Sequence, residues 1–460
     1  MDCGALVERQ RIYFRSHATR PLGFRLARLR ELQAAIDAHE AELLASLHAD
    51  LHKPPQEAFA SELGMVLGEI RHALGHLSQW MKPRRGRSTL LTWPGRAHVD
   101  PEPYGVTLIV APWNYPFQLL FTPLVGAIAA GNCACLKPSE LAPQTSAVMT
   151  RLIRATFPEE YIAVVEGGRA ETEVLLEQRF DCIFFTGSTQ VGRSVMAAAA
   201  RYLTPVTLEL GGKSPCIVCA DSPLEVTARR IVWGKTMNAG QTCVAPDYVL
   251  VDRTVRDALI AAMSRAIGDF YGPDPLSSPD YGRIVNRRHF DRLVGYLDQG
   301  NIVHGGSSSA SELYIEPTIL SDVSLAAPVM EEEIFGPILP VVDFVDFEQA
   351  LAFLRNRPTP LALYLFTNDR QTQQRLVAET RSGGVCINDT VVQLLGKDLP
   401  FGGVGESGIG AYHGRASFEV FTHSKSVMER ALWVDPGVRY PPFRQPLGAF
   451  KRMFRFMMGG

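Results

Sequence analysis

Residues 106–137 of the 460-residue chain read VTLIVAPWNYPFQLLFTPLVGAIAAGNCACLK. They contain a short apolar strand at Val106–Val110, an apolar helix at Pro116–Ala130 and a second apolar strand at Cys133–Lys137. The run Phe117–Ala130 is too short to span a bilayer, so we expect a buried helix. Short apolar strands that alternate with helices are typical of a parallel sheet covered by helices on both faces. The stretch therefore predicts an α/β fold.

The same alternation extends along most of the chain. The first set continues with strands at Ile162–Val165, Cys182–Phe185 and Pro205–Leu210. After a break at Gly211-Gly212, a second set has strands at Ser214–Val218, Asp247–Val251, Ile338–Val342, Ala362–Phe366 and Val385–Ile387. Two such sets predict two parallel sheets, and ligands of such sheets bind at the carboxyl ends of the strands.

Composition shifts mark the expected domain organisation. Residues 83–103 hold four prolines and short β-prone pieces, which predict an arm that leaves the body. A strand-like segment from Ser417 to Met428 is expected to pair with that arm. The expected parts are a first domain at 1–210 interrupted by the arm segment 83–103, a second domain at 211–414, an arm strand within 415–440 and a tail at 441–460.

The overall composition narrows the class of protein. The chain is too long for one hydrophobic core, and its 46% apolar and 20% charged residues are typical of a globular protein. A net charge of −2 gives no general attraction to nucleic acid. Eight dispersed cysteines form no disulfide framework and suit a reducing compartment. Because the N-terminus has no apolar signal segment, we expect a cytoplasmic enzyme.

Cys243 is the candidate nucleophile. It ends the segment Asn238–Cys243, which joins a helix-like stretch to a strand-like one, so rigid elements hold the thiol on both sides. Gly240 lets the backbone take a positive φ or approach a ligand closely. We expect the thiol pKa to be lowered, because the thiolate is the reactive form. The alternative is a buried core cysteine, which the residue type alone favours.

Two polar residues at strand ends are candidates for the same chemistry. Glu209 ends a strand just before two glycines and could face a cleft as a general base; the alternative is a capping or salt-bridging glutamate. Asn114 follows the strand Val106–Val110, and its amide could stabilise an oxyanion. The alternative for Asn114 is a turn built on Asn and Pro.

Phosphate and ribose binding are indicated at two other strand ends. Gly187–Gly192 lies between a strand and a helix, where backbone N–H groups bind anions. Its spacing is not that of the dinucleotide motif, and Arg193 replaces the lysine of a P-loop. Lys137 and Glu140 could hold a ribose, although a solvated loop pair is the simpler interpretation. The pairs Cys133/Cys135 and Cys216/Cys219 lie in apolar strands and predict no metal site.

Taken together, the order and spacing of these motifs resemble the aldehyde dehydrogenase superfamily. The short N-terminus, Asn114-Tyr115-Pro116 and Tyr440–Phe443 are similar to the class 3 branch in particular. The motifs that carry the resemblance are Pro112–Asn114, Lys137–Glu140, Phe185–Ser188, Leu208–Lys213, Gly240–Cys243, Glu333–Pro337 and Pro400–Gly403.

The resemblance implies a role for each candidate. Cys243 would be the nucleophile and Glu209 the base, and Asn114 would form the oxyanion hole with the backbone N–H of Cys243. The implied cofactor-binding residues are Lys137, Glu140, Thr186, Gly187, Ser188, Glu333 and Phe335. The implied substrate-pocket residues are Tyr115, Met237, Phe401 and His413.

The resemblance also implies an architecture and a reaction. It implies a Rossmann-like NAD domain, a catalytic domain and a β arm that builds a homodimer, with NAD as cofactor and NADP also accepted. A medium-chain or aromatic aldehyde would become the acid through a cysteine thiohemiacetal and a thioester. The tail residues 450–458 mix basic and bulky apolar side chains and could contact a membrane surface. Docking on the protein or on a partner subunit is the favoured interpretation.

Three rival functions stay open on the sequence alone. An enzyme of the same fold could pass the acyl group to coenzyme A, although a base for water at Glu209 argues against it. A P-loop-like nucleotide hydrolase could be inferred from Gly187–Ser194, but Arg193 stands where the lysine should be. A non-catalytic scaffold is disfavoured because Cys243, Glu209 and Asn114 occur together.

Overall fold

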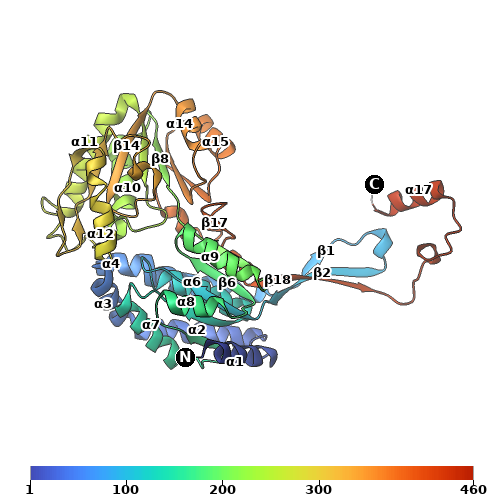
Figure 1. The fold of residues 1–460 in the computed structure, drawn as a ribbon. Helices are drawn as coiled ribbons and strands as arrows, with labels where there is room; N and C mark the ends of the chain where they lie inside the picture. The colour runs from blue at the N-terminus through green and yellow to red at the C-terminus, as the bar shows by residue number, and fades with distance from the viewer. Residues whose placement is uncertain (1, 459–460) are drawn as a thin grey trace.

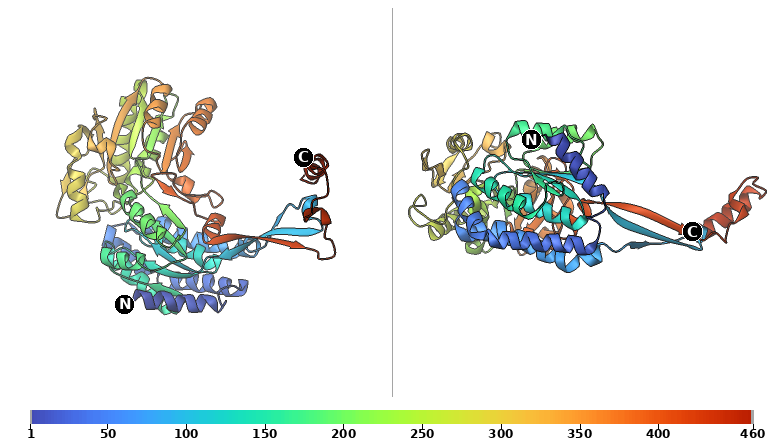
Figure 2. Two further views of the ribbon diagram at one scale, coloured as in Figure 1. Left: turned by 45° about the vertical axis from the view of Figure 1, so that its right-hand side comes forward. Right: turned by 90° about the horizontal axis from the view of Figure 1, so that it is seen from below.

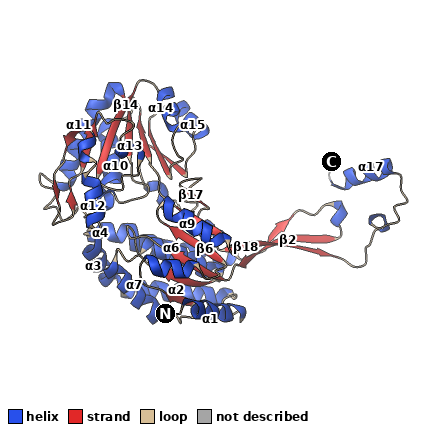
Figure 3. Ribbon diagram, viewed as in Figure 1, coloured by secondary structure: helices blue, strands red, loops and turns tan. Residues whose placement is uncertain are grey.

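The computed structural model describes residues 2–458. Two α/β bodies lie one above the other, and a narrow arm with the C-terminal tail projects away from the lower body (Figure 1). The view from below and the turned view both show the arm clear of the two bodies (Figure 2). Helices cover the sheets of each body, which is the α/β class that the alternation of apolar strands and helices predicts (Figure 3).

The first body contains a six-stranded sheet with the order β17-β7-β6-β3-β4-β5. Five of its strands are parallel, and β17 (Gly408–Ile409) pairs antiparallel with β7. The parallel strands are β3 (Val106–Val110), β4 (Cys133–Lys137), β5 (Ile162–Val164), β6 (Cys182–Thr186) and β7 (Val206–Glu209). The order runs outward in both directions from β3, so the crevice beyond its carboxyl end is the expected ligand site.

Helices cover both faces of this sheet. Those that follow its strands are α6 (Gln118–Ala130), α7 (Pro143–Thr156), α8 (Arg169–Leu176) and α9 (Thr189–Ala200). The N-terminal helices are α1 (Cys3–Arg15), α2 (Leu22–Ala38), α3 (Glu40–Leu51) and α5 (Gly64–Trp80), and a short π-helical segment, η1 (Phe59–Leu63), precedes α5. Helices α2 and α5 both pack on α6. Helices α2 and α5 therefore add a layer outside α6, whereas α1 packs directly on β3 and β4.

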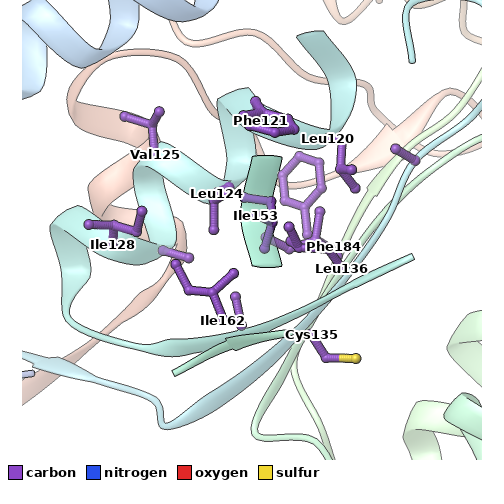
Figure 4. Close-up of a cluster of buried hydrophobic side chains, with 14 of the residues drawn as sticks. Leu120, Phe121, Leu124, Val125, Ile128, Cys135, Leu136, Ile153, Ile162 and Phe184 are labelled. Carbon is purple, nitrogen blue, oxygen red and sulfur yellow. The ribbon is translucent and has the colours of Figure 1, made fainter. Parts of the chain in front are cut away.

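The core of the first body forms around α6. All 13 residues of this helix are buried, which explains why it is apolar on every side. Leu120 and Leu124 of α6 share this core with Leu136 of β4 and Phe184 of β6, and Phe121 lies on the side of α6 turned away from the strands (Figure 4). Because α6 follows β3 directly, this packing fixes the position of the turn between them, which carries candidate site residues.

The second body contains a seven-stranded sheet with the order β10-β13-β14-β9-β8-β15-β16. Its strands are β8 (Pro215–Val218), β9 (Tyr248–Asp252), β10 (Asn301–His304), β13 (Thr318–Ser321), β14 (Ile338–Phe344), β15 (Ala362–Phe366) and β16 (Gly384–Ile387). Its helices include α10 (Leu224–Thr236), α11 (Arg256–Tyr271), α12 (Arg287–Val294), α13 (Pro328–Glu331), α14 (Phe347–Arg355) and α15 (Arg370–Glu379). All its strands are parallel except β10, which adds an antiparallel edge.

The arm is a three-stranded antiparallel sheet of β1 (Arg84–Gly86), β2 (Gly95–Pro103) and β18 (Thr422–Arg430). The register runs from Thr422 opposite Pro103 to Arg430 opposite Gly95, which confirms that the late strand pairs with the early arm. The strand begins later than Ser417, because Arg415–Val420 form helix α16, which packs on α6.

The tail ends in helix α17 (Leu447–Met458), at the far end of the arm (Figure 1). None of its residues is buried, and Phe456 is 71% exposed. Among residues 2–458, no helix combines the length and the apolar character that crossing a membrane requires.

Candidate active site

Cys243 lies on a tightly turned loop between α10 and β9. Asn238 and Ala239 both have φ near 51°, in the left-handed region that non-glycine residues rarely adopt. Gly240 has a φ of 76°, and a Cβ there would collide with the carbonyl oxygen of Gly336. The loop therefore needs Gly240, and the surrounding structure must hold its two strained neighbours in place.

Hydrogen bonds from the β3–α6 turn hold this loop. The Asn238 side chain donates to the carbonyl oxygens of Asn114 at 2.8 Å and Gln241 at 3.2 Å. The Asn114 amide nitrogen donates to the same Gln241 oxygen at 3.0 Å. Because an amide nitrogen has two hydrogens, one N–H of Asn114 is used in this bond and one is left for a ligand. The loop with Cys243 and the turn with Asn114 are thus joined directly.

A buried ion pair secures the turn from behind. The Lys53 ammonium, which is fully buried, lies 2.6 Å from Glu62 Oε1 and donates to the Asn114 carbonyl oxygen at 2.7 Å. It also lies 3.9 Å from the centre of the Tyr115 ring. The other oxygen of Glu62 accepts from the backbone N–H groups of Phe117 and Gln118, just before and at the start of α6. The sequence prediction missed Lys53 and Glu62, because they lie over fifty residues before the turn that they hold.

Glu209 faces the sulfur of Cys243. Its Oε1 lies 3.6 Å from Sγ, within hydrogen-bonding reach for a thiol. Its Oε2 accepts from the hydroxyl of Tyr412 at 2.8 Å and from that of Thr186 at 3.3 Å. Thr186, expected among the cofactor residues, thus bonds to the candidate base, because β6 and β7 pair Thr186 with Glu209 in register. Tyr412 was not predicted as a site residue.

The electrostatics around the sulfur correct one expectation. Burial, and after it the carboxylate of Glu209, raises the pKa of the Cys243 thiol above its usual range, whereas we expected it to be lowered. The next contribution comes from Glu333, which also raises it. The expectation was wrong because the thiol is buried and the charged neighbours of the sulfur are acidic. Burial also raises the pKa of Glu209 to about 7, so this group exchanges a proton near neutral pH.

Cys243 and Glu209 line a cavity of about 190 Å³. The structure places all four predicted pocket residues on its wall: Tyr115, Met237, Phe401 and His413. Further side chains that line it are mostly apolar, among them Leu119, Trp233, Val244, Val391 and Leu395. The Tyr115 hydroxyl is hydrogen-bonded to the Thr242 hydroxyl at 2.7 Å. Burial lowers the pKa of His413 to about 4, so its ring is neutral at pH 7.

On the other side of the sulfur, Glu333 and Phe335 stand at the joint between the two bodies. Oε1 of Glu333 is buried without a hydrogen-bond partner in the described part of the chain. A Cβ on Gly211 would collide with its carboxylate. Phe335 packs edge-on against Trp113 from the β3–α6 turn, with ring centres 5.4 Å apart. A buried acceptor without a donor fits a ligand hydroxyl, which is the chemistry of a ribose.

The other predicted cofactor residues lie at the ends of β4 and β6. Lys137 donates to the carbonyl oxygens of Pro138 at 2.8 Å and Gly167 at 2.5 Å, and burial lowers the pKa of its ammonium. Glu140 is exposed. Gly187 precedes Ser188, whose hydroxyl caps the twelve-residue helix α9 by accepting from the backbone N–H of Val191. A helix N-terminus after β6 and an exposed carboxylate after β4, at the same edge of the sheet, fit the diphosphate and ribose of a dinucleotide.

Fold and site together define a class of enzyme. A cysteine and a carboxylate share one cavity, and a second cavity, lined by Thr189, Gly211 and Glu333 among others, lies where parallel strands end. A family model described as "Aldehyde dehydrogenase family" matches residues 1–427, and the chain belongs to this family.

Three similar proteins illustrate the relationship. The 4,4'-diaponeurosporen-aldehyde dehydrogenase of Staphylococcus aureus is 47% identical, over 96% of this chain and 97% of that protein. Aldehyde dehydrogenase family 3 member A2 of Rattus norvegicus is 46% identical, over 97% of this chain and 93% of that protein. A solved structure described as the substrate-bound state of Staphylococcus aureus AldH superposes with a TM-score of 0.96 at 46% identity. It covers 98% of this chain and 99% of its own.

These relationships confirm the resemblance to class 3 aldehyde dehydrogenases and the predicted fold class. The chain oxidises an aldehyde to the carboxylic acid, with NAD or NADP as cofactor. The P-loop hydrolase and the acyl-transferring enzyme are not favoured.

Proposed function

We propose that the chain oxidises medium-chain aliphatic or aromatic aldehydes, with Cys243 as nucleophile and Glu209 as proton acceptor. The observation that carries the proposal is the 3.6 Å separation of Cys243 Sγ and Glu209 Oε1 in one largely apolar cavity. Apolar walls favour an alkyl or aryl group, because burying such a group removes apolar surface from water.

The first step is addition of the sulfur to the aldehyde carbon. Glu209 Oε1 takes the thiol proton, and Sγ forms a bond to the carbonyl carbon, whose oxygen gains the negative charge. The free N–H of the Asn114 amide and the backbone N–H of Cys243 donate to that oxygen. Each donor of this kind contributes about 10²–10³ in rate. The hydrogen bonds that fix Asn114 to the Cys243 loop keep these donors in place before the substrate arrives.

The cofactor would lie against Glu333, Phe335, Gly187 and Ser188, with Lys137 and Glu140 at its adenosine end. When bound, it supplies the oxidising group for the aldehyde carbon. Oxidation of the thiohemiacetal leaves a thioester on Cys243. The unpartnered Oε1 of Glu333 would accept a ribose hydroxyl, and the Phe335 ring would set the position of the cofactor ring.

The second step is hydrolysis of the thioester. Glu209 releases its first proton to solvent and then accepts one from water, whose oxygen attacks the thioester carbon and frees the acid. A pKa of about 7 suits both roles, because such a group gains and loses a proton readily at neutral pH.

A panel of aldehydes with NAD and with NADP tests the proposal. We expect the highest kcat/KM for medium-chain or aromatic aldehydes, with free acid as product. Formation of acyl-CoA when coenzyme A is added, in place of free acid, would revive the acyl-transferring alternative. A kcat/KM that falls steadily as the alkyl chain lengthens from two carbons would contradict the role of the apolar cavity.

We further propose that the chain is a cytoplasmic homodimer built through the arm, with the tail docked on the partner. Two observations support the dimer: the arm projects from the body, and relatives include an enzyme of Canis lupus familiaris named as dimeric and NADP-preferring. The proposed parts are residues 1–210 with the arm 83–103, residues 211–414, and the segment from 415 onward. Light scattering should give twice the chain mass, and deletion of residues 441–460 should destabilise the dimer.

A further inference from the structure

Tyr412 reaches the active site from a segment far along the chain. It follows the short strand β17, and its backbone exchanges two hydrogen bonds with Phe401 at 2.8 and 2.9 Å. Its ring packs edge-on against Phe184 and His413, with centres 5.0 and 4.4 Å away. The side chain is only 1% exposed, yet it lines the cavity that holds Cys243. The ring is therefore fixed, and its hydroxyl has a defined direction.

The Tyr412 hydroxyl gives the two oxygens of Glu209 different neighbours. Tyr412 donates to Oε2 at 2.8 Å, and Thr186 donates to the same oxygen at 3.3 Å. Oε1 is left facing Cys243 Sγ at 3.6 Å. A carboxylate held by one oxygen cannot rotate freely, so its other oxygen stays turned to the sulfur and to a water molecule attacking there.

We propose that Tyr412 is a positioning residue for Glu209: its hydroxyl anchors Oε2 so that Oε1 faces the reacting sulfur, and it stabilises the ionised carboxylate. The inference rests on the proposed role of Glu209 as proton acceptor and deepens it. No step transfers a proton from Tyr412, which remains a hydrogen-bond donor throughout.

The charges around Glu209 explain why this donor matters. The titratable groups that share its cavity are Cys243, Tyr412, Tyr115 and the neutral ring of His413, so none supplies a positive charge. Burial raises the pKa of Glu209, and the Tyr412 hydrogen bond is the largest contribution that lowers it. Burial and Glu209 raise the pKa of Tyr412 well above 10, so the phenol stays protonated at every working pH.

The test is the pH profile of kcat for Tyr412→Phe, which keeps the ring and removes only the hydroxyl. Hydrogen bonds to charged groups contribute enough to move a pKa by about one to two units. We expect the acid limb of the profile to move to higher pH by that amount. At pH above the shifted limb, kcat should recover most of the wild-type value, and KM should change by less than about threefold.

Two companion variants separate positioning from general packing. Thr186→Val removes the longer hydrogen bond and should move the acid limb in the same direction by less. Tyr281→Phe removes another buried hydroxyl, which donates to the Ile315 carbonyl oxygen in the second body, and should leave the limb in place. If Tyr412→Phe lowers kcat equally at all pH values, the role is structural only and the proposal is wrong.

A second measurement keeps the Tyr412 hydroxyl and changes its acidity. Replacing the tyrosines with 3-fluorotyrosine makes each phenol more acidic and a stronger donor, so the acid limb should move to lower pH. The same labelling of Tyr412→Phe should have no such effect, and a limb that does not move in the labelled wild type would overturn the proposal. An acyl adduct on Cys243 of Tyr412→Phe would show that the nucleophile stands even where the positioning role fails.

Discussion

The two sides of the proposed nucleophile, Cys243, differ in how completely their buried charged groups are paired. On the substrate side, Lys53, Glu62 and Asn114 bond to one another and to the backbone. On the cofactor side, Glu333 keeps one buried oxygen without a partner in the described chain. An unmet buried polar group costs about 1–3 kcal/mol. The difference indicates that the buried charges on the proposed substrate side are paired without a ligand, whereas that of Glu333 on the proposed cofactor side is left for one.

Lys53→Met removes the buried ion pair with Glu62 on the proposed substrate side, and it should give the largest loss of stability. It leaves Glu62 as a buried charge without its cation, which costs about 3–5 kcal/mol. Burial lowers the pKa of Lys53 and raises that of Glu62, which favours the neutral form of each. The charge of each partner opposes this shift and helps the other to stay charged. Urea unfolding measures the loss.

The double variant Lys53→Met/Glu62→Gln should recover part of that loss, because no charge is left buried alone. The control is Arg415→Met, which breaks an exposed pair with Glu419 and should cost less than about 1 kcal/mol. Equal effects of Lys53→Met and Arg415→Met would show that the buried pair does not hold the turn.

Glu333→Gln changes the proposed cofactor side, where a buried oxygen has no partner in the described chain. In contrast to Lys53→Met, it should lower activity strongly and stability only slightly. We expect a fall in kcat/KM for the cofactor of about 10²-fold, because the amide is a poorer acceptor for a ribose hydroxyl than the carboxyl group. Titration of cofactor binding by protein fluorescence distinguishes weaker binding from slower chemistry. Unchanged binding and unchanged turnover would remove Glu333 from the cofactor site.

The same variant should change how stability depends on pH. Burial, with Asp247, raises the pKa of Glu333 to about 8, above its ordinary value of 4.5. A carboxyl group whose pKa rises on folding stabilises the fold below pH 4.5, and this contribution is lost as the pH rises towards 8. The Tm of Glu333→Gln minus that of the wild type, without cofactor, should therefore increase from pH 5 to pH 8. The exposed Glu225→Gln should show no such trend.

The pH dependence of turnover tests the role of Glu209 as the proton acceptor. Because burial raises its pKa to about 7, kcat should fall about tenfold per pH unit below that value. The fall follows from protonation of the base and not from unfolding, which circular dichroism at each pH would verify. A flat profile between pH 5 and 8 would contradict the assignment of Glu209.

Glu140→Gln should give the smallest effect. The exposed carboxylate lies at the expected ribose end of the cofactor site, where it repels a 2′-phosphate. Its removal should raise kcat/KM for NADP relative to NAD by about tenfold or less, because exposed charges interact weakly through water. The comparison of both cofactors on one aldehyde measures this. If the ratio of kcat/KM for NADP to that for NAD does not change, the adenosine ribose does not bind beside Glu140.

The fold class and many of the candidate site residues could be predicted from the sequence, because these residues lie at the ends of strands. Asn114, Lys137, Thr186 and Glu209 all follow or end buried parallel strands, and such ends meet at one edge of the sheet. Periodicity and motif order are sufficient to find them.

The rest depends on contacts between distant parts of the chain. Tyr412 donates to Glu209, more than 200 residues away in the sequence. Lys53 donates to Asn114 from the N-terminal helical segment, whose sequence contains no motif that predicts this contact. The predicted direction of the Cys243 pKa shift was wrong because the sequence shows neither that the thiol is buried nor that acidic groups lie beside it.

The most direct test of the account is to trap the covalent intermediate. Glu209→Gln, mixed with aldehyde and NAD and quenched within one turnover, is digested and analysed by mass spectrometry. Loss of the carboxylate removes the acceptor of the thiol proton, but it also removes the largest cause after burial of the raised thiol pKa. Solvent can then take that proton, so acylation should slow less than hydrolysis. We predict an acyl group on the Cys243 peptide that accumulates in Glu209→Gln and not in the wild type or in Cys243→Ala. Acid formed without any adduct at Cys243, or an adduct on another residue, would contradict the account.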